Sequence, residues 1–188
     1  MNDKPELFFA RDVEWYEWLS QNHDNSGGIY LIFYKLELNV PTMRWEEAVK
    51  VALCFGWIDS TVKSLGDGKR RQYFCARNPK SVWSALNKRY IIQLLEDNLM
   101  QESGLAKIEI AKQNGMWTAL DDVENEVISK DLQKAFKANP TAHKNYKAFA
   151  PSYRKSYLYW LNQAKREATR QNRIEKIIEF CSANKKTR

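Results

Sequence analysis

Hydrophobic spacing divides the first half of the chain into helices and strands. From Trp45 to Leu53, apolar residues recur at the i, i+3, i+4, i+7 and i+8 spacing of one helix face. Thr42 is the expected cap of this helix, and Gly56 is the expected stop. Residues 29–35 are almost continuously apolar and rich in β-branched and aromatic residues, which predicts a strand covered on both faces.

A β-hairpin is predicted after this helix. Residues 57–64 and 69–77 are two strand-like runs, and Gly66-Asp-Gly68 between them is a turn sequence. The remaining pattern is mostly helical. The other expected helices are 13–22 capped by Asp12, 85–97 capped by Ser84, 105–114 capped by Ser103, 129–138, 141–149 capped by Thr141, and a segment from Pro151 that breaks in two near Arg166 to Thr169; Asp121 to Glu126 is expected to be an acidic loop.

These elements predict an α+β fold: a small antiparallel sheet, with a β-hairpin packed by helices, and an all-helical C-terminal half. We expect a single domain over residues 1–188, with a mixed α/β part at 1–84 and a helical part at 85–184.

Charge is distributed in blocks along the chain. The net charge is +7, and residues 59–89 and 142–188 are basic blocks of +6 and +9. The two acidic blocks, residues 1–58 and 90–141, carry −4 each. If the basic blocks share a face, they form a cationic patch suited to an anionic small molecule, a nucleic acid or an acidic protein.

Several classes of protein are excluded or disfavoured. No apolar run is long enough to span a membrane, and the charged start of the chain does not resemble a secretory signal, so we expect a cytoplasmic protein. Cys54, Cys75 and Cys181 are odd in number and widely spaced, which argues against disulfides and a zinc site. We expect no metal and no cofactor, and we expect Cys54 and Cys181 to be buried and unreactive.

The hairpin contains the main candidate site. Alternation would place Trp57, Asp59, Thr61 and Lys63 on one face of the first strand. On the second strand, alternate positions carry cations and aromatic or thiol side chains. Together the two faces would form a basic groove with an aromatic floor, able to stack a base or sugar and to hold a phosphate or carboxylate. Alternatively, the arginines cover the aromatics and pair with Asp59. The second-strand residues are Arg71, Tyr73, Cys75 and Arg77.

Three further features extend this hypothesis. Asp59 is a candidate general base, although its cationic neighbours favour structural pairing. Ser81, Trp83 and Ser84 precede a helix start and are candidates for anion binding or, alternatively, for helix capping. The third feature is a helical stripe of Arg166, Arg170 and Arg173, which either extends the hairpin groove or is a solvated face.

Four motifs occur in order along the chain: Ala52-Leu-Cys-Phe-Gly-Trp-Ile-Asp59, Arg77-x-Pro-x-Ser-x-Trp-Ser84 with Asn87, Ala111-Lys-x-x-Gly-x-Trp117, and Ala164-Lys-x-x-x-Thr-Arg170-x-x-Arg-Ile174. Together they resemble the YdeI/OmpD-associated family of bacterial proteins. The resemblance implies an α+β fold with a helical end and a role in bacteriocin protection or resistance to cationic antimicrobial peptides. It implies no catalytic residues, and Ser60 stands where the family pattern has Gly.

Three functional classes remain open. The first is a stress-protection protein that binds an anionic ligand in the basic aromatic groove. The second is an enzyme acting on a phosphorylated or anionic small molecule with Asp59 as base, although no familiar catalytic signature occurs in the sequence. The third is a scaffold whose basic face docks an acidic protein partner.

Overall fold

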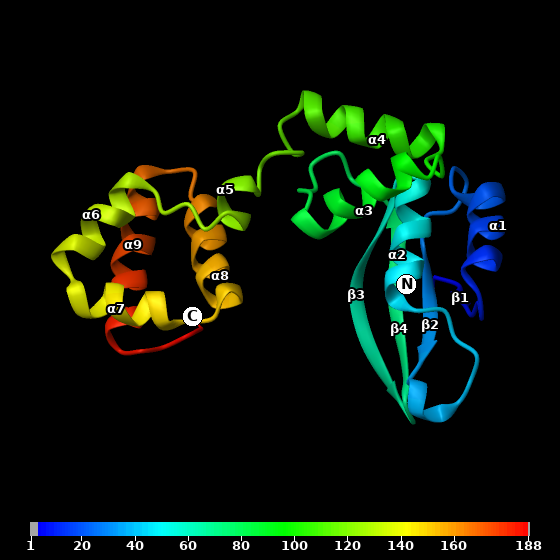
Figure 1. The fold of residues 1–188 in the computed structure, drawn as a ribbon, viewed down its shortest axis with the longest axis horizontal. Helices are drawn as coiled ribbons and strands as arrows, with labels where there is room; N and C mark the ends of the chain where they lie inside the picture. Colours follow the sequence, from blue (N-terminus) through cyan, green and yellow to red (C-terminus); the bar gives the residue numbers. More distant parts are fainter. Residues whose placement is uncertain (1–3, 188) are drawn as a thin grey trace. The chain divides into compact units, whose positions relative to one another are not determined.

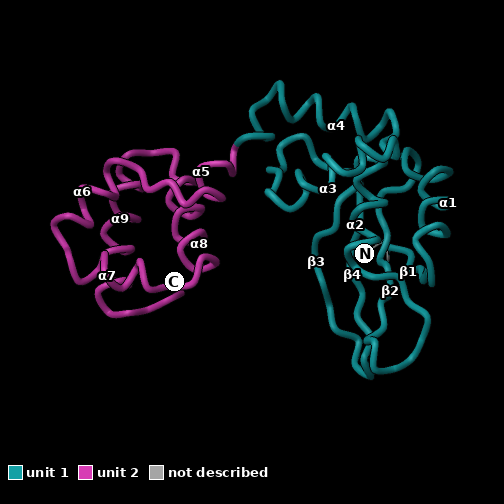
Figure 2. The backbone as a smooth tube through the Cα atoms, in the orientation of Figure 1, with its two compact units in different colours: residues 1–118 teal, residues 119–188 magenta. Residues whose placement is uncertain are grey.

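The computed structural model describes residues 4–187, which form two compact units. The first unit is Met1–Thr118 and the second is Ala119–Arg188 (Figure 2). The predicted α+β class with a helical C-terminal half is confirmed. The single domain over residues 1–188 stays a prediction.

Four strands form one sheet in the order β1-β2-β4-β3 (Figure 1). The predicted hairpin is present, and β2 pairs antiparallel with its second strand. The short strand β1 was not predicted, and it pairs parallel with β2. The strands are β1 (Glu6–Leu7), β2 (Ile29–Tyr34), β3 (Trp57–Gly66) and β4 (Lys69–Ala76).

Helices cover one face of this sheet, not both. Ile29, Leu31 and Phe33 of β2 are buried, whereas the alternate side chains are only half-buried. The prediction that β2 is covered on both faces is therefore wrong. The alternate positions include Tyr30 and Tyr34, whose hydroxyl groups let an aromatic side chain remain partly in water.

Tryptophans dominate the core beneath the covered face. Trp15 of α1 (Asp12–Asn22) makes edge contacts with Trp57 and Phe74, at ring-centroid distances of 6.2 and 5.8 Å. Its indole N–H donates to the carbonyl of Ala48 in α2 (Trp45–Cys54), which joins the two helices. Because the indole both packs and finds an acceptor, it is fully buried without an unpaired donor.

The starts of α1 and α2 differ from the predicted caps in the same way, and α7 (Pro140–Ala148) is likewise preceded by Asn139 and not by the predicted Thr141. The residue preceding α2 is Arg44, not Thr42, and the Glu47 carboxylate accepts from its backbone N–H. Likewise Arg11, not Asp12, precedes α1. In α1 and α2 the backbone N–H of the residue before the helix donates to a glutamate three residues later. The glutamate in the first turn therefore determines where the helix begins.

Two more helices complete the first unit. Ser84 caps α3 (Ala85–Glu96) as predicted, accepting from the Asn87 backbone N–H. The helix α4 (Glu102–Gln113) begins after Gln101, not at the predicted Ser103. A Cβ on Gly104 would collide with the backbone carbonyl of Cys54, so glycine is what lets α4 lie close to the end of α2.

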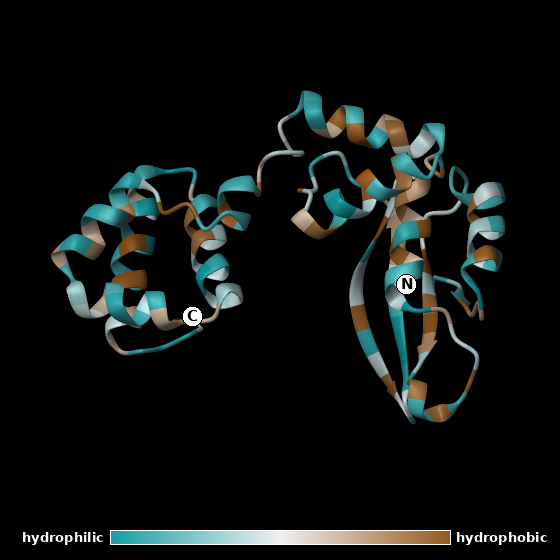
Figure 3. Ribbon diagram, in the orientation of Figure 1, coloured by the Kyte–Doolittle hydropathy of each residue, from teal (hydrophilic) through white to brown (hydrophobic). Residues whose placement is uncertain are grey.

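The second unit is entirely helical over its described residues. Figure 3 shows hydrophobic bands alternating with hydrophilic ones along its last helix, whose buried residues include Ile174 and Ile177. The predicted break near residues 166–169 is confirmed, and the predicted acidic loop at 121–126 is instead a short helix followed by a turn. Its helices are α5 (Asp121–Glu124), α6 (Lys130–Ala138), α7 (Pro140–Ala148), α8 (Pro151–Asn162) and α9 (Glu167–Ser182).

None of the helices within residues 4–187 combines the length and the apolar character that crossing a bilayer requires.

The three thiols should react in a fixed order. Burial raises the pKa of Cys54 to about 11 and that of Cys181 to about 12, whereas Cys75 is only half-buried. In native protein at about pH 8, a thiol reagent should therefore label Cys75 first and the other two only as fast as the protein opens. Mass spectrometry of labelled peptides would measure the order, and Cys75→Ser should remove the fast phase. Fast labelling of Cys54 or Cys181 would contradict the burial described here.

Candidate functional site

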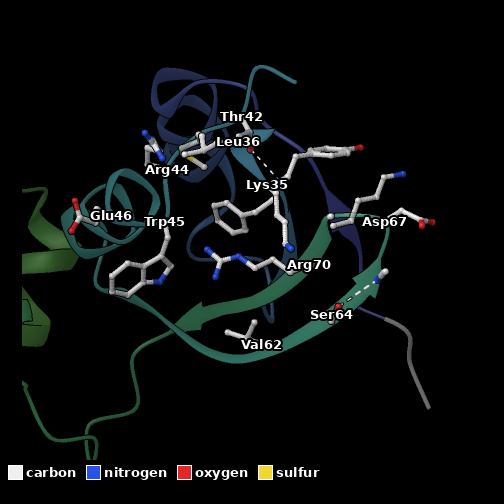
Figure 4. Close-up of a pocket in the computed structure, with 16 residues that line it drawn as sticks. Lys35, Leu36, Thr42, Arg44, Trp45, Glu46, Val62, Ser64, Asp67 and Arg70 are labelled. Atoms are coloured by element: carbon white, nitrogen blue, oxygen red, sulfur yellow. Dashed lines mark hydrogen bonds between the residues drawn. The ribbon is translucent and has the colours of Figure 1, made fainter. Parts of the chain in front are cut away.

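A groove of about 900 Å³ lies in the first unit (Figure 4). Its lining comes from the end of β2, the segment leading into α2, and the far half of the β3–β4 hairpin. Cations outnumber acids on this lining, four to two. The charged lining residues are Lys35, Arg44, Glu46, Asp67, Lys69 and Arg70.

Arg70 occupies the middle of this groove and extends toward Trp45 (Figure 4). Strand pairing places Arg70 opposite Phe33, and its guanidinium carbon lies 5.2 Å from the centre of that ring. Within residues 4–187, Arg70 forms no ion pair and its guanidinium donates no hydrogen bond. The ring shields one side of the cation, and its donors remain available to a ligand.

The wall of the groove at Trp45 is fixed by Asp59. The Trp45 indole N–H donates to Oδ2 of Asp59 at 3.0 Å, and the Gln72 amide donates to the same oxygen. Gln72 is buried on β4 and Trp45 is the first residue of α2, so the carboxylate ties the helix start to the sheet. An oxygen that already accepts from two N–H groups is a structural acceptor, which favours a structural role for Asp59 over a general base. Its hydrogen-bond partners are Trp45 and Gln72, not the arginines that the sequence led us to expect.

Arg77 is buried and also has a structural role. Only 4% of its surface is exposed, and its guanidinium stacks 3.7 Å from the Trp83 ring and donates to the Val82 carbonyl at 2.6 Å. Burial lowers its pKa to about 10, against the opposing effect of the Asp59 charge. These contacts hold the turn that follows β4. Ser81 donates to the Asn78 carbonyl in the same turn.

A register shift in β3 separates the residues predicted to share one face. Asp59 pairs with Phe74, but Val62 pairs with Gln72, so β3 has one more residue than β4 between these pairs. Trp57 and Asp59 therefore face the helices, while Lys63 lies opposite Arg71 on the uncovered face.

The residues on the uncovered face are tied to their neighbours. Arg71 forms an ion pair with Glu6 and lies 4.3 Å above the ring of Tyr30. The Tyr73 hydroxyl donates to the Gly27 carbonyl at 2.8 Å. Trp57 belongs to the core on the other side: it is 1% exposed, and its indole donates to the His23 carbonyl. Ligand binding by these residues stays a prediction.

The arginine stripe belongs to the second unit, where two of its members join helices. Arg170 of α9 donates twice to the Asp131 carboxylate of α6, at 2.5 and 3.1 Å. Arg173 donates to the Trp160 carbonyl of α8 and lies 5.1 Å over that indole. Arg166 is exposed at the start of α9. Because the stripe and the hairpin lie in different units, a shared groove stays a prediction.

Sequence reasoning missed Arg70 and its aromatic neighbours. The run Lys69-Arg70-Arg71 was visible, and alternation along a strand places Arg70 on the face opposite to Arg71. The missing information was which face the helices cover. One signal was present in the sequence. Phe33 and Leu31 alternate along β2 and so lie on the same buried face, and Arg70 pairs with Phe33 on that face.

Comparison with known families gives two matches. Residues 7–107 match a family model described as Domain of unknown function (DUF8412), which covers more than half of the chain. The chain belongs to the DUF8412 family. Residues 127–184 match a model described as Bacteriocin-protection, YdeI or OmpD-Associated, which confirms the resemblance in the second unit. The sequence motifs at residues 52–59 and 77–87 lie within the DUF8412 match.

Searches of curated proteins and of solved structures found no match. Among residues 4–187, no group of three or more histidine, cysteine and acidic side chains is arranged to hold a metal ion.

Replacing Asp59 should loosen the start of α2. In Asp59→Asn the two N–H donors lose a charged acceptor, so we expect a loss of about 1–2 kcal/mol in the free energy of unfolding. Urea denaturation followed by tryptophan fluorescence would measure it, with the exposed Asp24→Asn as control. Trp45→Phe removes one of the same bonds, so the double variant should lose less than the sum of the single losses. Additive losses would mean that Asp59 and Trp45 are not coupled.

The Asp131–Arg170 pair should make the second unit sensitive to acid. The Arg170 guanidinium holds the pKa of Asp131 well below its ordinary value of 3.8. Because the folded pKa is depressed, the stabilisation is complete above about pH 4 and is lost as pH falls toward the folded pKa. Asp131→Asn should cost about 1 kcal/mol at neutral pH, since the pair is partly exposed, and should flatten this acid dependence.

Circular dichroism of urea unfolding across pH would measure this dependence, with the exposed Asp122→Asn as the matched control. An unchanged acid dependence in Asp131→Asn would show that other carboxylates dominate.

Proposed function

We propose that this protein binds an anionic ligand in the groove around Arg70, as part of bacterial protection against bacteriocins or cationic antimicrobial peptides. The role in bacteriocin protection rests on the description of the family that residues 127–184 match. The extension to cationic antimicrobial peptides rests on what the resemblance of the sequence motifs implies. The binding role rests on the groove in the first unit.

The observation that carries the binding proposal is the guanidinium of Arg70 without a protein counter-ion. Lys35, Arg44 and Lys69 line the same groove, and within the described residues none of these three makes an ion pair. Like charges gathered on one concave surface raise the local potential and attract anions. The guanidinium fork then offers paired donors that match a phosphate or carboxylate.

A second observation favours the scaffold alternative. Residues 119–188 hold 15 basic and 8 acidic side chains, whereas residues 1–118 hold 15 of each, so the second unit accounts for the whole net charge of +7. Its helices α6 and α7 present five exposed lysines, and the only acid between residues 130 and 148 is Asp131, which pairs with Arg170. The lysines are Lys130, Lys134, Lys137, Lys144 and Lys147.

Anion binding at Arg70 should raise the melting temperature of the first unit. With phosphate or an organic phosphate at about ten times its dissociation constant, the gain is about 1.4 kcal/mol, equivalent to a few degrees. Six of the seven tryptophans lie in residues 1–118, so intrinsic fluorescence reports mainly on this unit. The shift should disappear in Arg70→Gln and persist in Arg89→Gln, which removes an exposed cation from α3.

Three outcomes separate the alternatives. The absence of a shift with all anions, or an equal shift in Arg70→Gln, would defeat binding at this groove. A shift produced by poly-glutamate and not by small anions would favour the scaffold. For the protective role, cells expressing Arg70→Gln should survive a cationic peptide less well than cells expressing the unchanged protein or Arg89→Gln.

A further inference from the structure

The groove around Arg70 also exposes apolar side chains. Leu36 and Val62 line it and are 53% and 49% exposed, although both are large hydrophobic residues. Phe33 and Met43 line it too and are otherwise buried, at 3% exposure each. Two more exposed leucines, Leu38 and Leu65, lie in the adjoining 3₁₀ helix and on β3.

Charge and apolar surface therefore alternate within one concavity. In Figure 4, Val62 lies on one side of Arg70, and Lys35 and Leu36 lie on the other. A small hydrated anion would satisfy the guanidinium but would leave Leu36 and Val62 in water. The volume of about 900 Å³ is at the upper end of the range for organic ligands and far exceeds the needs of an inorganic ion.

We propose that the ligand of this groove is a single-chain amphiphilic anion, with a phosphate or carboxylate head on Arg70 and an alkyl body against Leu36 and Val62. The inference rests on the proposed anion binding and specifies its ligand class. Burial of the alkyl body removes both its own surface and that of the groove from water. Each fully buried methylene group should strengthen binding by about fourfold.

Leu36 and Val62, which form the apolar rim of the groove, also explain why a plain anion should bind more weakly than an amphiphilic one. Exposed apolar side chains that lie together in a concave site offer an apolar partner a surface on which it can be buried. The nearby lysines would then draw the head group to Arg70 and leave the alkyl chain to follow the rim. Both parts of the ligand contribute, so neither an inorganic phosphate nor a neutral alcohol should bind as well as the combined molecule.

A series of n-alkyl phosphates, each below its micelle-forming concentration and at fixed ionic strength, tests this directly. Affinity measured by calorimetry should rise about two- to fourfold per methylene over the first several carbons and then level off. Arg70→Gln should lower the affinity of every member by about tenfold or more without changing the slope. Val62→Thr should lower the slope, and Val13→Thr, at a similarly exposed position on α1, should leave it unchanged.

The outcomes distinguish this inference from the proposed function. Equal affinity for inorganic phosphate and all alkyl phosphates would overturn the amphiphile and leave anion binding intact. No binding of any member would defeat both. A slope unaffected by Val62→Thr, a neutral alcohol that binds as tightly as the phosphate of the same chain length, or binding only to vesicles of anionic lipid would each overturn the single-chain ligand.

Discussion

The first unit depends on one half-buried carboxylate. Asp59 accepts from the first residue of α2 and from a buried glutamine of β4, so helix and sheet meet at a charged group and not at apolar contacts alone. Donors around a carboxylate make strong, directional bonds, whereas hydrophobic packing tolerates sliding. The groove exists because α2 begins at this point, and the segment before it, together with β2 and the hairpin, forms the concavity.

Regular spacing predicted the helices and the hairpin well. Helix positions followed from apolar periodicity, and the break before α9 followed from its loss. The caps of α1 and α2 were predicted wrongly, because a glutamate inside the first turn can compete with a threonine or aspartate placed just before it. Thr42 and Asp12 show this: both are good capping residues by type, yet each helix begins beside the residue whose backbone bonds to the glutamate.

The candidate site was harder to predict, because strand alternation fails at a bulge. One extra residue between Asp59 and Val62 reverses the faces of the residues from Val62 to Ser64, so Trp57 and Lys63 lie on opposite sides of the sheet. No residue type in this segment marks the extra residue. The same ambiguity concealed Arg70, whose environment depends on which sheet face the helices cover. Arg71, its neighbour in the sequence, lies on the uncovered face, and ligand binding by Arg71 stays a prediction.

The bulge has another consequence, for association between molecules. Within residues 4–187 the strand β3 is an edge of the sheet that pairs with β4 alone, and its outer row of N–H and carbonyl groups faces away from the sheet. A long regular edge is a template on which strands of other molecules can add. The two irregularities in the β3–β4 pairing interrupt the spacing that such addition requires, and Lys63 places a charge between them. The distortion of β3 thus disfavours intermolecular sheet extension and aggregation along this edge.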